Sequence, residues 1–124
     1  MTAFFETGIV CLFPTLFGMI PFKLYGQMLS STTGIDEFSD EQFLFRIGER
    51  IWNLERLFNI REGFGRKEDT LPRRFKEEPL KEGPRKDHTV DLEPMLKEYY
   101  QARGWNSESG APTEEKLKDL EIFV

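Results

Sequence analysis

A single cysteine, Cys11, is the residue of this chain whose chemistry suits a metal centre. It ends the segment Glu6-Thr7-Gly8-Ile9-Val10-Cys11, which also carries one carboxylate. A thiolate is the ligand that iron–sulfur clusters and many zinc sites require. No second cysteine is present, so this chain alone cannot complete a four-cysteine site or form an intramolecular disulfide. Judged by spacing alone, Cys11 is a small, buried hydrophobic residue.

The other candidates for chemistry are one histidine and a group of arginines. His88 lies in a polar stretch with no second His, Cys or acid pair at ligand spacing, so a catalytic role requires a partner from elsewhere. Four arginines have the geometry to bind phosphates: Arg61, Arg66, Arg73 and Arg74. Because Glu62, Glu68 and Asp69 lie equally close in sequence, neutralisation on a solvated face is the favoured interpretation.

The composition limits the class of protein. The chain has 124 residues, enough for one domain, and 39% of them are hydrophobic. Its formal net charge is −5, which argues against a nucleic-acid-binding protein. The single cysteine suits a reducing compartment, so we expect a cytoplasmic location. Twelve phenylalanines indicate either a dense aromatic core or a surface that another part of a protein covers.

The first 29 residues are the most apolar part of the chain. No charge occurs between Gly8 and Phe22, but Pro14, Gly18 and Pro21 interrupt the run, which argues against a membrane span. There is no basic region typical of a signal peptide. We therefore predict a buried, irregular, proline-bent segment between short helices. A chain that begins within an apolar core is typical of a fragment of a longer protein.

A long amphipathic helix organises the middle of the chain. One face carries apolar residues at helical spacing: Phe43, Ile47, Ile51, Leu54 and Phe58. Asn53 and Arg56 lie largely off this face, and Asn53 is interpreted as a hydrogen-bonding rather than a catalytic residue. Ser39 is the predicted N-cap, with Gln42 completing a capping box. Gly63 and Gly65 are predicted to end the helix.

Shorter helices are predicted on both sides of the long one. A helix begins near Pro21 and ends at Gly34, and residues 76–89 form an extended loop. Asp91 is positioned to cap a helix that Gly104 ends. Trp105 then packs back on that helix. Thr113 caps a last short helix. No segment has a clear strand pattern, so the sequence predicts an all-α fold in one domain.

Three stretches resemble a known family. They are GERIWNLERLFNIREGFGRKEDTLPRRF, then EEPL with KEGP, then DLEPMLKEYYQARGWNSESGAPTEEKLKDL. In order and spacing they resemble the C-terminal portion of the tungsten- or molybdenum-dependent aldehyde ferredoxin oxidoreductases. The resemblance extends from about Leu24 to near the end of the chain. It implies that residues 1–124 form a multihelical C-terminal domain of a longer oxidoreductase.

The resemblance also gives roles to two residues near the N-terminus. Family members carry an Asp-x-x-Gly-x-Cys element at this place. Its cysteine is the last ligand of a 4Fe-4S cluster, and its acid binds the pterin cofactor. By position Cys11 matches that ligand and Glu6 matches the acid. The sequence departs from the element in two ways: the acid is Glu, and Ile9 stands where glycine is expected, with Gly8 one place early.

The implied activity is oxidation of an aldehyde to a carboxylate at a tungsten or molybdenum bis-pterin centre, with electrons leaving through the cluster to ferredoxin. The implied partners are the N-terminal domains of the same protein and ferredoxin; a homodimer stays open. Neither nucleic acid nor a membrane is expected as a partner. Because three cluster ligands are missing, the isolated chain is predicted to bind no cluster and to be inactive.

Two alternatives remain open from the sequence. The chain could be a stand-alone helical interaction or assembly module that lacks the cofactor, which the departures at Glu6 and Ile9 favour slightly. It could also belong to a related reductase subunit that acts on an aromatic thioester. Neither the substrate nor the choice between tungsten and molybdenum can be read from these residues.

Overall fold

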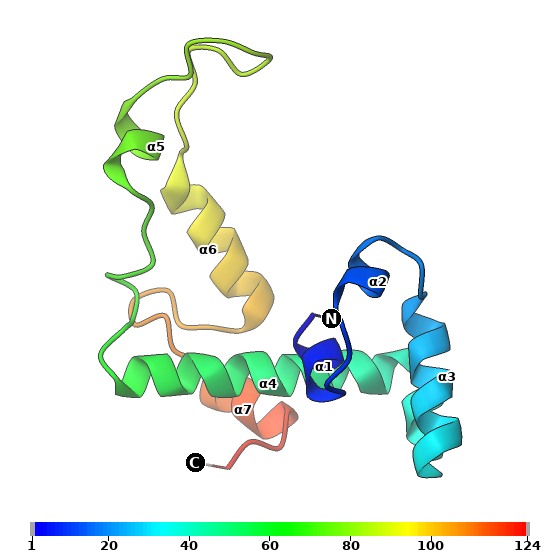
Figure 1. The fold of residues 1–124 in the computed structure, drawn as a ribbon. Helices are drawn as coiled ribbons and strands as arrows, with labels where there is room; N and C mark the ends of the chain where they lie inside the picture. Colours follow the sequence, from blue (N-terminus) through cyan, green and yellow to red (C-terminus); the bar gives the residue numbers. More distant parts are fainter. Residues whose placement is uncertain (1, 124) are drawn as a thin grey trace. The chain divides into compact units, whose positions relative to one another are not determined.

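The structure, a computed structural model, describes residues 2–123. Its helices are α1 (Thr2–Thr7), α2 (Phe13–Leu16), α3 (Phe22–Thr33), the 3-10 helix η1 (Asp36–Ser39), α4 (Glu41–Arg61), α5 (Arg73–Glu77), α6 (Leu92–Arg103) and α7 (Glu114–Asp119) (Figure 1). Within the described residues, the only β-type pairing is an isolated bridge between Trp105 and Pro112. The all-α prediction is therefore confirmed. No helix in this part of the chain is long and apolar enough to cross a membrane.

Helix α4 is a single unbroken helix of 21 residues (Figure 1). Its N-terminus is capped by Asp40, because the Gln42 backbone N–H donates to Asp40 Oδ1 at 2.9 Å. The prediction of Ser39 as the cap is therefore wrong; Ser39 ends η1 instead. Gly63, at φ +92°, takes the predicted left-handed conformation after the helix, which a residue with a Cβ adopts only at a cost.

The predicted apolar face of α4 is wrong in the C-terminal half of the helix. Leu54 and Phe58, two residues of that face, are about half exposed. Asn53 and Arg56, predicted to lie off that face, expose only 0% and 8% of their surface. Asn53 Nδ2 donates to the Glu49 carbonyl oxygen at 2.9 Å, within its own helix. Polar side chains can be buried when such hydrogen bonds replace those to water, and apolar periodicity does not register this.

The chain forms two compact units. The first contains residues up to Glu55 together with Leu120–Ile122, and the second contains Arg56–Asp119 and Phe123. The core of the first unit consists of Phe4, Phe5, Tyr25 and Leu44. The rings of Phe5 and Tyr25 lie 4.8 Å apart, and Phe4 meets Phe22 edge to face at 5.9 Å. Part of the high phenylalanine content thus forms the predicted aromatic core.

Helix α3 is held between a proline and a glycine, as predicted. Pro21 occupies its N-cap, and Gly34 follows it at φ +74°, donating its backbone N–H to Ser30 O at 2.9 Å. Gly26 lies inside this helix where η1 and α4 approach it. A Cβ at Gly26 would overlap the Phe38 carbonyl oxygen and come within 2.7 Å of Leu44 Cδ1. Only glycine allows this approach.

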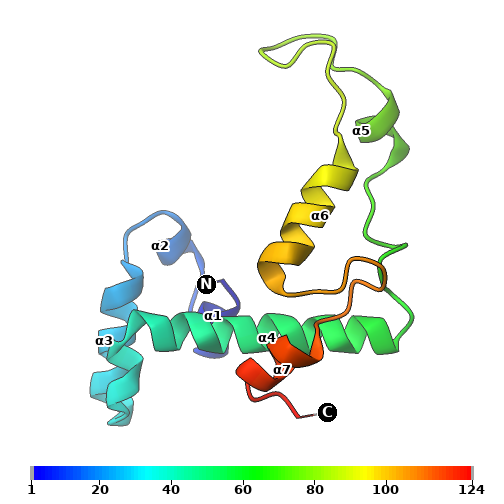
Figure 2. The same cartoon turned by 180° about the vertical axis from the view of Figure 1, so that it is seen from behind.

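In the second unit, α6 and α7 are joined by a turn that the sequence predicts well (Figure 2). Gly104 ends α6 at φ +66°, and the buried Trp105 ring meets Tyr99 edge to face at 5.6 Å. Thr113 Oγ1 accepts the Lys116 backbone N–H at 3.2 Å and caps α7. Asp91 stands at the N-cap of α6, but its side chain makes no capping hydrogen bond.

The predicted loop over residues 76–89 is present, although α5 includes its first two residues. It runs out beyond the N-terminal start of α6 and returns (Figure 2). The Leu80 backbone N–H donates to His88 O at 3.2 Å, and the Asp87 N–H donates to Leu80 O at 2.8 Å. These bonds close the loop near its base, while most of its side chains are exposed.

Candidate functional site

Residues 6–11, here called the Cys11 loop, leave the end of α1 in a tight turn. Thr7 Oγ1 donates to the Phe4 carbonyl oxygen at 2.7 Å. The Gly8 backbone N–H donates to Phe5 O at 3.2 Å, and the Ile9 N–H donates to Glu6 O at 3.1 Å. The buried rings of Phe4 and Phe5 therefore anchor the start of the loop through their own carbonyl groups.

Ile9 has a backbone conformation that isoleucine rarely adopts. Its φ is +53°, in the left-handed region where a Cβ clashes with the following carbonyl oxygen. Its side chain is 95% exposed, so packing does not offset this strain. Ile9 stands where the family element has glycine, and glycine takes this conformation without steric cost. Ile9 therefore adopts a backbone conformation that suits glycine, at the cost of steric strain.

Both predicted site residues are on the surface. Glu6 is exposed on α1, and Cys11 is a free, exposed thiol. The prediction from spacing that Cys11 is buried is wrong. The prediction of a buried segment is also wrong for its central part, since Ile9, Phe13 and Met19 are largely exposed. α2 has only four residues, too few to direct a continuous apolar face into the core.

The chemistry of these two side chains suits the groups that the family element holds. An exposed thiol can reach a cluster whose other ligands come from outside this segment, and a carboxylate can accept hydrogen bonds from pterin N–H groups. Within residues 2–123, no group of three or more His, Cys, Asp and Glu side chains is placed to hold a metal ion. The loop thus offers one thiolate and one carboxylate, rather than a complete site.

Tyr25, on α3, contacts the Cys11 loop from the core side. It is 5% exposed, and its hydroxyl has no hydrogen-bond partner among the described residues. Burial raises the pKa of this hydroxyl above its usual value. A Cβ built on Gly8 would fall on the Tyr25 hydroxyl oxygen. The hydroxyl therefore lies directly against the backbone of the loop, and no feature of the sequence indicated this contact.

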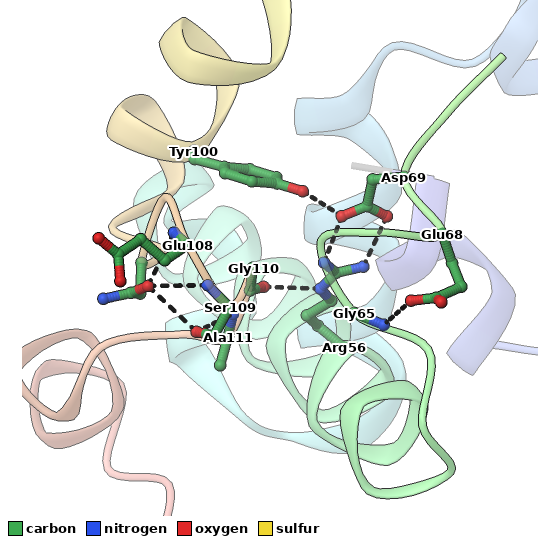
Figure 3. Close-up of polar contacts among 10 residues, drawn as sticks. Arg56, Gly65, Glu68, Asp69, Tyr100, Glu108, Ser109, Gly110 and Ala111 are labelled. Atoms are coloured by element: carbon green, nitrogen blue, oxygen red, sulfur yellow. Dashed lines mark hydrogen bonds and ion pairs between the residues drawn. The ribbon is translucent and has the colours of Figure 1, made fainter. Parts of the chain in front are cut away.

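The second unit contains a polar cluster that the sequence reading missed (Figure 3). It consists of Arg56, Asp69, Tyr100 and Gly110 and is here called the Arg56 network. Arg56 Nη1 donates to Asp69 Oδ1 at 2.9 Å, and Arg56 Nε donates to the Gly110 carbonyl oxygen at 2.8 Å. Asp69 Oδ2 accepts hydrogen bonds from both Arg56 Nη2 and the Tyr100 hydroxyl. The Arg56 guanidinium also lies 4.8 Å from the centre of the Trp105 ring.

The ionisation of these groups follows from their mutual contacts. Burial alone would raise the pKa of Asp69, but hydrogen bonds from Arg56 and Tyr100, with the nearby arginine charges, lower it overall. Burial alone would lower the pKa of Arg56, but Asp69 raises it overall. Burial, followed by the hydrogen bond to Asp69 and its charge, raises the pKa of Tyr100 to about 12. The network therefore stays in one charge state near neutral pH: a guanidinium, a carboxylate and a neutral phenol.

In the Arg56 network each charge has its partner in place. The carboxylate accepts three donors, and the guanidinium is used by a carboxylate, a backbone carbonyl and an aromatic face. Such an arrangement joins the end of α4, the segment after it and α6, and we interpret it as structural. Asp69 and Gly110 lie far from Arg56 in sequence, so no local spacing could have revealed them.

The four arginines considered as phosphate ligands all pair with acids, but only Glu62 is one of the three acids predicted to neutralise them. The pairs are Arg61 with Glu62, Arg66 with Glu93, Arg73 with Glu77 and Arg74 with Glu78. Three of these acids are not those expected, because Glu68 accepts the Gly65 backbone N–H at 2.7 Å and Asp69 pairs with Arg56. His88 is exposed in the predicted loop.

Comparison with known proteins shows which family has a similar sequence. The sequence profile of the family described as "Aldehyde ferredoxin oxidoreductase, domains 2 & 3" matches residues 1–122. The chain is 50% identical over 121 residues to a tungsten-containing aldehyde ferredoxin oxidoreductase of Pyrococcus horikoshii. It is 51% identical over the same length to that of Pyrococcus abyssi and 48% identical over 123 residues to that of Pyrococcus furiosus.

These matches cover 97–98% of the chain but only 19–20% of each relative. The chain therefore spans about a fifth of the length of these relatives. The family resemblance drawn from the three stretches is confirmed, and the profile includes Glu6 and Cys11 within its matched range. With half of its residues identical to these enzymes, the chain belongs to the aldehyde ferredoxin oxidoreductase family.

Proposed function

We propose that this chain is the C-terminal part of a tungsten-containing aldehyde ferredoxin oxidoreductase, and that Cys11 supplies one thiolate to its 4Fe-4S cluster. The observation that supports this most directly is the exposed thiol of Cys11, on a loop whose start is anchored by the core. The other three cysteines come from the N-terminal domains of the same protein. A cytoplasmic location agrees with a protein that keeps a reduced thiolate.

Glu6 has a separate role in the proposal. Its exposed carboxylate on α1 accepts hydrogen bonds from pterin N–H groups, which suits an acceptor-only side chain. When bound, the tungsten–pterin group supplies the oxygen-transfer chemistry that converts an aldehyde to a carboxylate, and the cluster supplies one-electron transfer to ferredoxin. The residues of this segment hold and orient these groups.

The proposal is tested in the full-length protein, purified without oxygen. We expect Cys11→Ser to lose roughly a quarter of the iron, because a cluster deprived of one thiolate sheds the iron atom that it held. Val10→Ser is the matched control, since it places the same side chain at the neighbouring exposed position and should keep all the iron. Glu6→Gln should lower tungsten content and leave iron unchanged.

Full iron content in Cys11→Ser would contradict the ligand role. A native protein without tungsten, molybdenum or iron would overturn the enzyme reading altogether. In that case the function would be that of a helical interaction module. The ratio of tungsten to molybdenum in the native protein decides which metal is used, and assays of aldehyde oxidation with ferredoxin test the acceptor.

A further inference from the structure

The Tyr25 hydroxyl is an unusual group to keep in an apolar core. The ring that carries it packs against the rings of Phe4 and Phe5, and Tyr25 is only 5% exposed. No described residue accepts a hydrogen bond from the hydroxyl or donates one to it. A buried hydroxyl without a partner destabilises the folded state relative to phenylalanine at the same position. The stability of the fold therefore does not explain why this residue is tyrosine rather than phenylalanine.

The contact that this oxygen does make is with the Cys11 loop. A Cβ on Gly8 would overlap the hydroxyl oxygen, so any other residue at this position would clash with Tyr25. Gly8 is not among the glycines with positive φ, and its need for glycine is therefore steric rather than conformational. Because the ring of Tyr25 is packed in the core, its hydroxyl is a rigid support for the backbone at Gly8.

Two further residues carry the chain from this support to the thiol. Ile9, next to Gly8, is held at φ +53°, and Val10 then leads to Cys11. The N–H groups of Gly8 and Ile9 are already used by carbonyl groups of α1. The backbone at Gly8 and Ile9 is thus fixed, and only Val10 separates it from Cys11, so a shift of Gly8 would move the thiol.

We propose that Tyr25 is a positioning residue for Cys11, acting through the contact of its hydroxyl with Gly8. This inference rests on the proposed role of Cys11 as a cluster ligand. Gly8 is then the residue whose lack of a side chain makes the contact feasible. The pair Gly8–Tyr25 sets the direction in which the thiolate meets the iron.

The test uses the full-length protein and measures iron content and the electron paramagnetic resonance spectrum and midpoint potential of the cluster. Gly8→Ala should lose about as much iron as Cys11→Ser, because the methyl group displaces the loop. In Gly8→Ala with Tyr25→Phe, iron should return to near the wild-type level. Without the hydroxyl, the atoms nearest to the new methyl are Tyr25 Cζ at 3.2 Å and Phe5 O at 3.6 Å. Val10→Ala is the control, since it changes an exposed side chain of the same loop at a residue without a positive φ.

Tyr25→Phe alone keeps the test decisive if Gly8→Ala fails to fold. It should retain all the iron and the fold, yet shift the midpoint potential and the resonance spectrum, because the loop loses its support. An unchanged spectrum and potential in Tyr25→Phe would overturn the inference, as would a double variant no better than Gly8→Ala. If Cys11→Ser loses iron while Gly8→Ala keeps it, the positioning inference fails and the ligand role stands. If Cys11→Ser keeps its iron, the ligand role itself fails.

Discussion

The Cys11 loop and the Arg56 network differ in how far the chain satisfies its own polar groups. In the network, buried charges are met by a carboxylate, a phenol, a backbone carbonyl and an aromatic face. In the loop, a thiol and a carboxylate are exposed, and the hydroxyl behind them has no partner among the described residues. The loop also contains a strained residue, Ile9.

This difference separates a structural cluster from a candidate site. Perturbed ionisation alone would have pointed to the Arg56 network, in which the pKa values of Arg56, Asp69 and Tyr100 are all shifted. Its groups are fully engaged with one another, and so offer little to a ligand. The Cys11 loop is strained at Ile9 and lies against a buried hydroxyl that has no partner among the described residues. Strain and unsatisfied polar groups persist where a chain serves something other than its own stability.

The largest effect is expected from removing Arg56, which tests whether the network is structural. Arg56→Ala should lower the free energy of unfolding by about 3–5 kcal/mol, because it leaves Asp69 partly buried without its main counter-charge. Denaturant titration measures this. Arg61→Ala is the matched control: it removes an exposed arginine paired with Glu62 and should cost under about 1 kcal/mol. Equal effects in the two variants would contradict the structural role of the network.

The pH dependence of stability tests the hydrogen bond from Tyr100. The pKa of Tyr100 is raised to about 12, so its contribution should be complete below pH 10 and be lost as the pH rises toward 12. The bond to a charged acceptor is worth about 1.5–3 kcal/mol. Asp69, with its lowered pKa, should lose its contribution only as the pH falls below its unfolded value near about 4. In Tyr100→Phe the alkaline loss should be reduced; an identical alkaline profile would refute the bond.

The packing of the first unit is tested at Gly26. Gly26→Ala should destabilise by about 1–3 kcal/mol, because the methyl group meets the Phe38 carbonyl oxygen and Leu44 Cδ1 in a filled core. Ser31→Ala, at an exposed position of the same helix, is the control and should change little. Thermal unfolding followed by circular dichroism distinguishes the two. Stabilisation by Gly26→Ala would show that helix propensity outweighs the close approach.

The smallest effect concerns the strain in the Cys11 loop. Ile9→Gly should raise the free energy of unfolding by at most about 1 kcal/mol, because relief of the left-handed conformation is partly offset by the entropy of glycine. Val10→Gly, beside it, lacks that relief and should destabilise. Both are measured by denaturant titration. A loss of stability in Ile9→Gly would mean that its exposed side chain has a contact of its own.

The sequence predicted best where a structure depends on neighbouring residues. Gly34, Gly63 and Gly104 all end their helices in the left-handed conformation, and Thr113 caps α7 as expected. The start of α4 was placed one residue early, since Ser39 and Asp40 are both good caps and only the preceding η1 decides between them. Local rules therefore give element ends to within about one residue here.

Prediction failed where burial depends on distant partners. The burial of Arg56 depends on Asp69 and Gly110, the latter separated from it by 54 positions, and periodicity cannot show this. The apolar sequence around Cys11 predicts burial, but Cys11 is exposed. The family resemblance predicts Cys11 and Glu6 as site residues, whereas the contact of Tyr25 with Gly8 is visible only in three dimensions.

The composition of the first unit has a consequence for synthesis on the ribosome. Leu120, only 1% exposed, and Ile122 belong to this unit, although its main part ends at Glu55. At roughly 5–20 residues per second, translation needs on the order of three to thirteen seconds to proceed from one to the other. During that interval the positions of Leu120 and Ile122 in this unit cannot be filled. The helices of this unit therefore spend seconds with apolar surface uncovered during synthesis, when a chaperone that binds apolar segments can act on them.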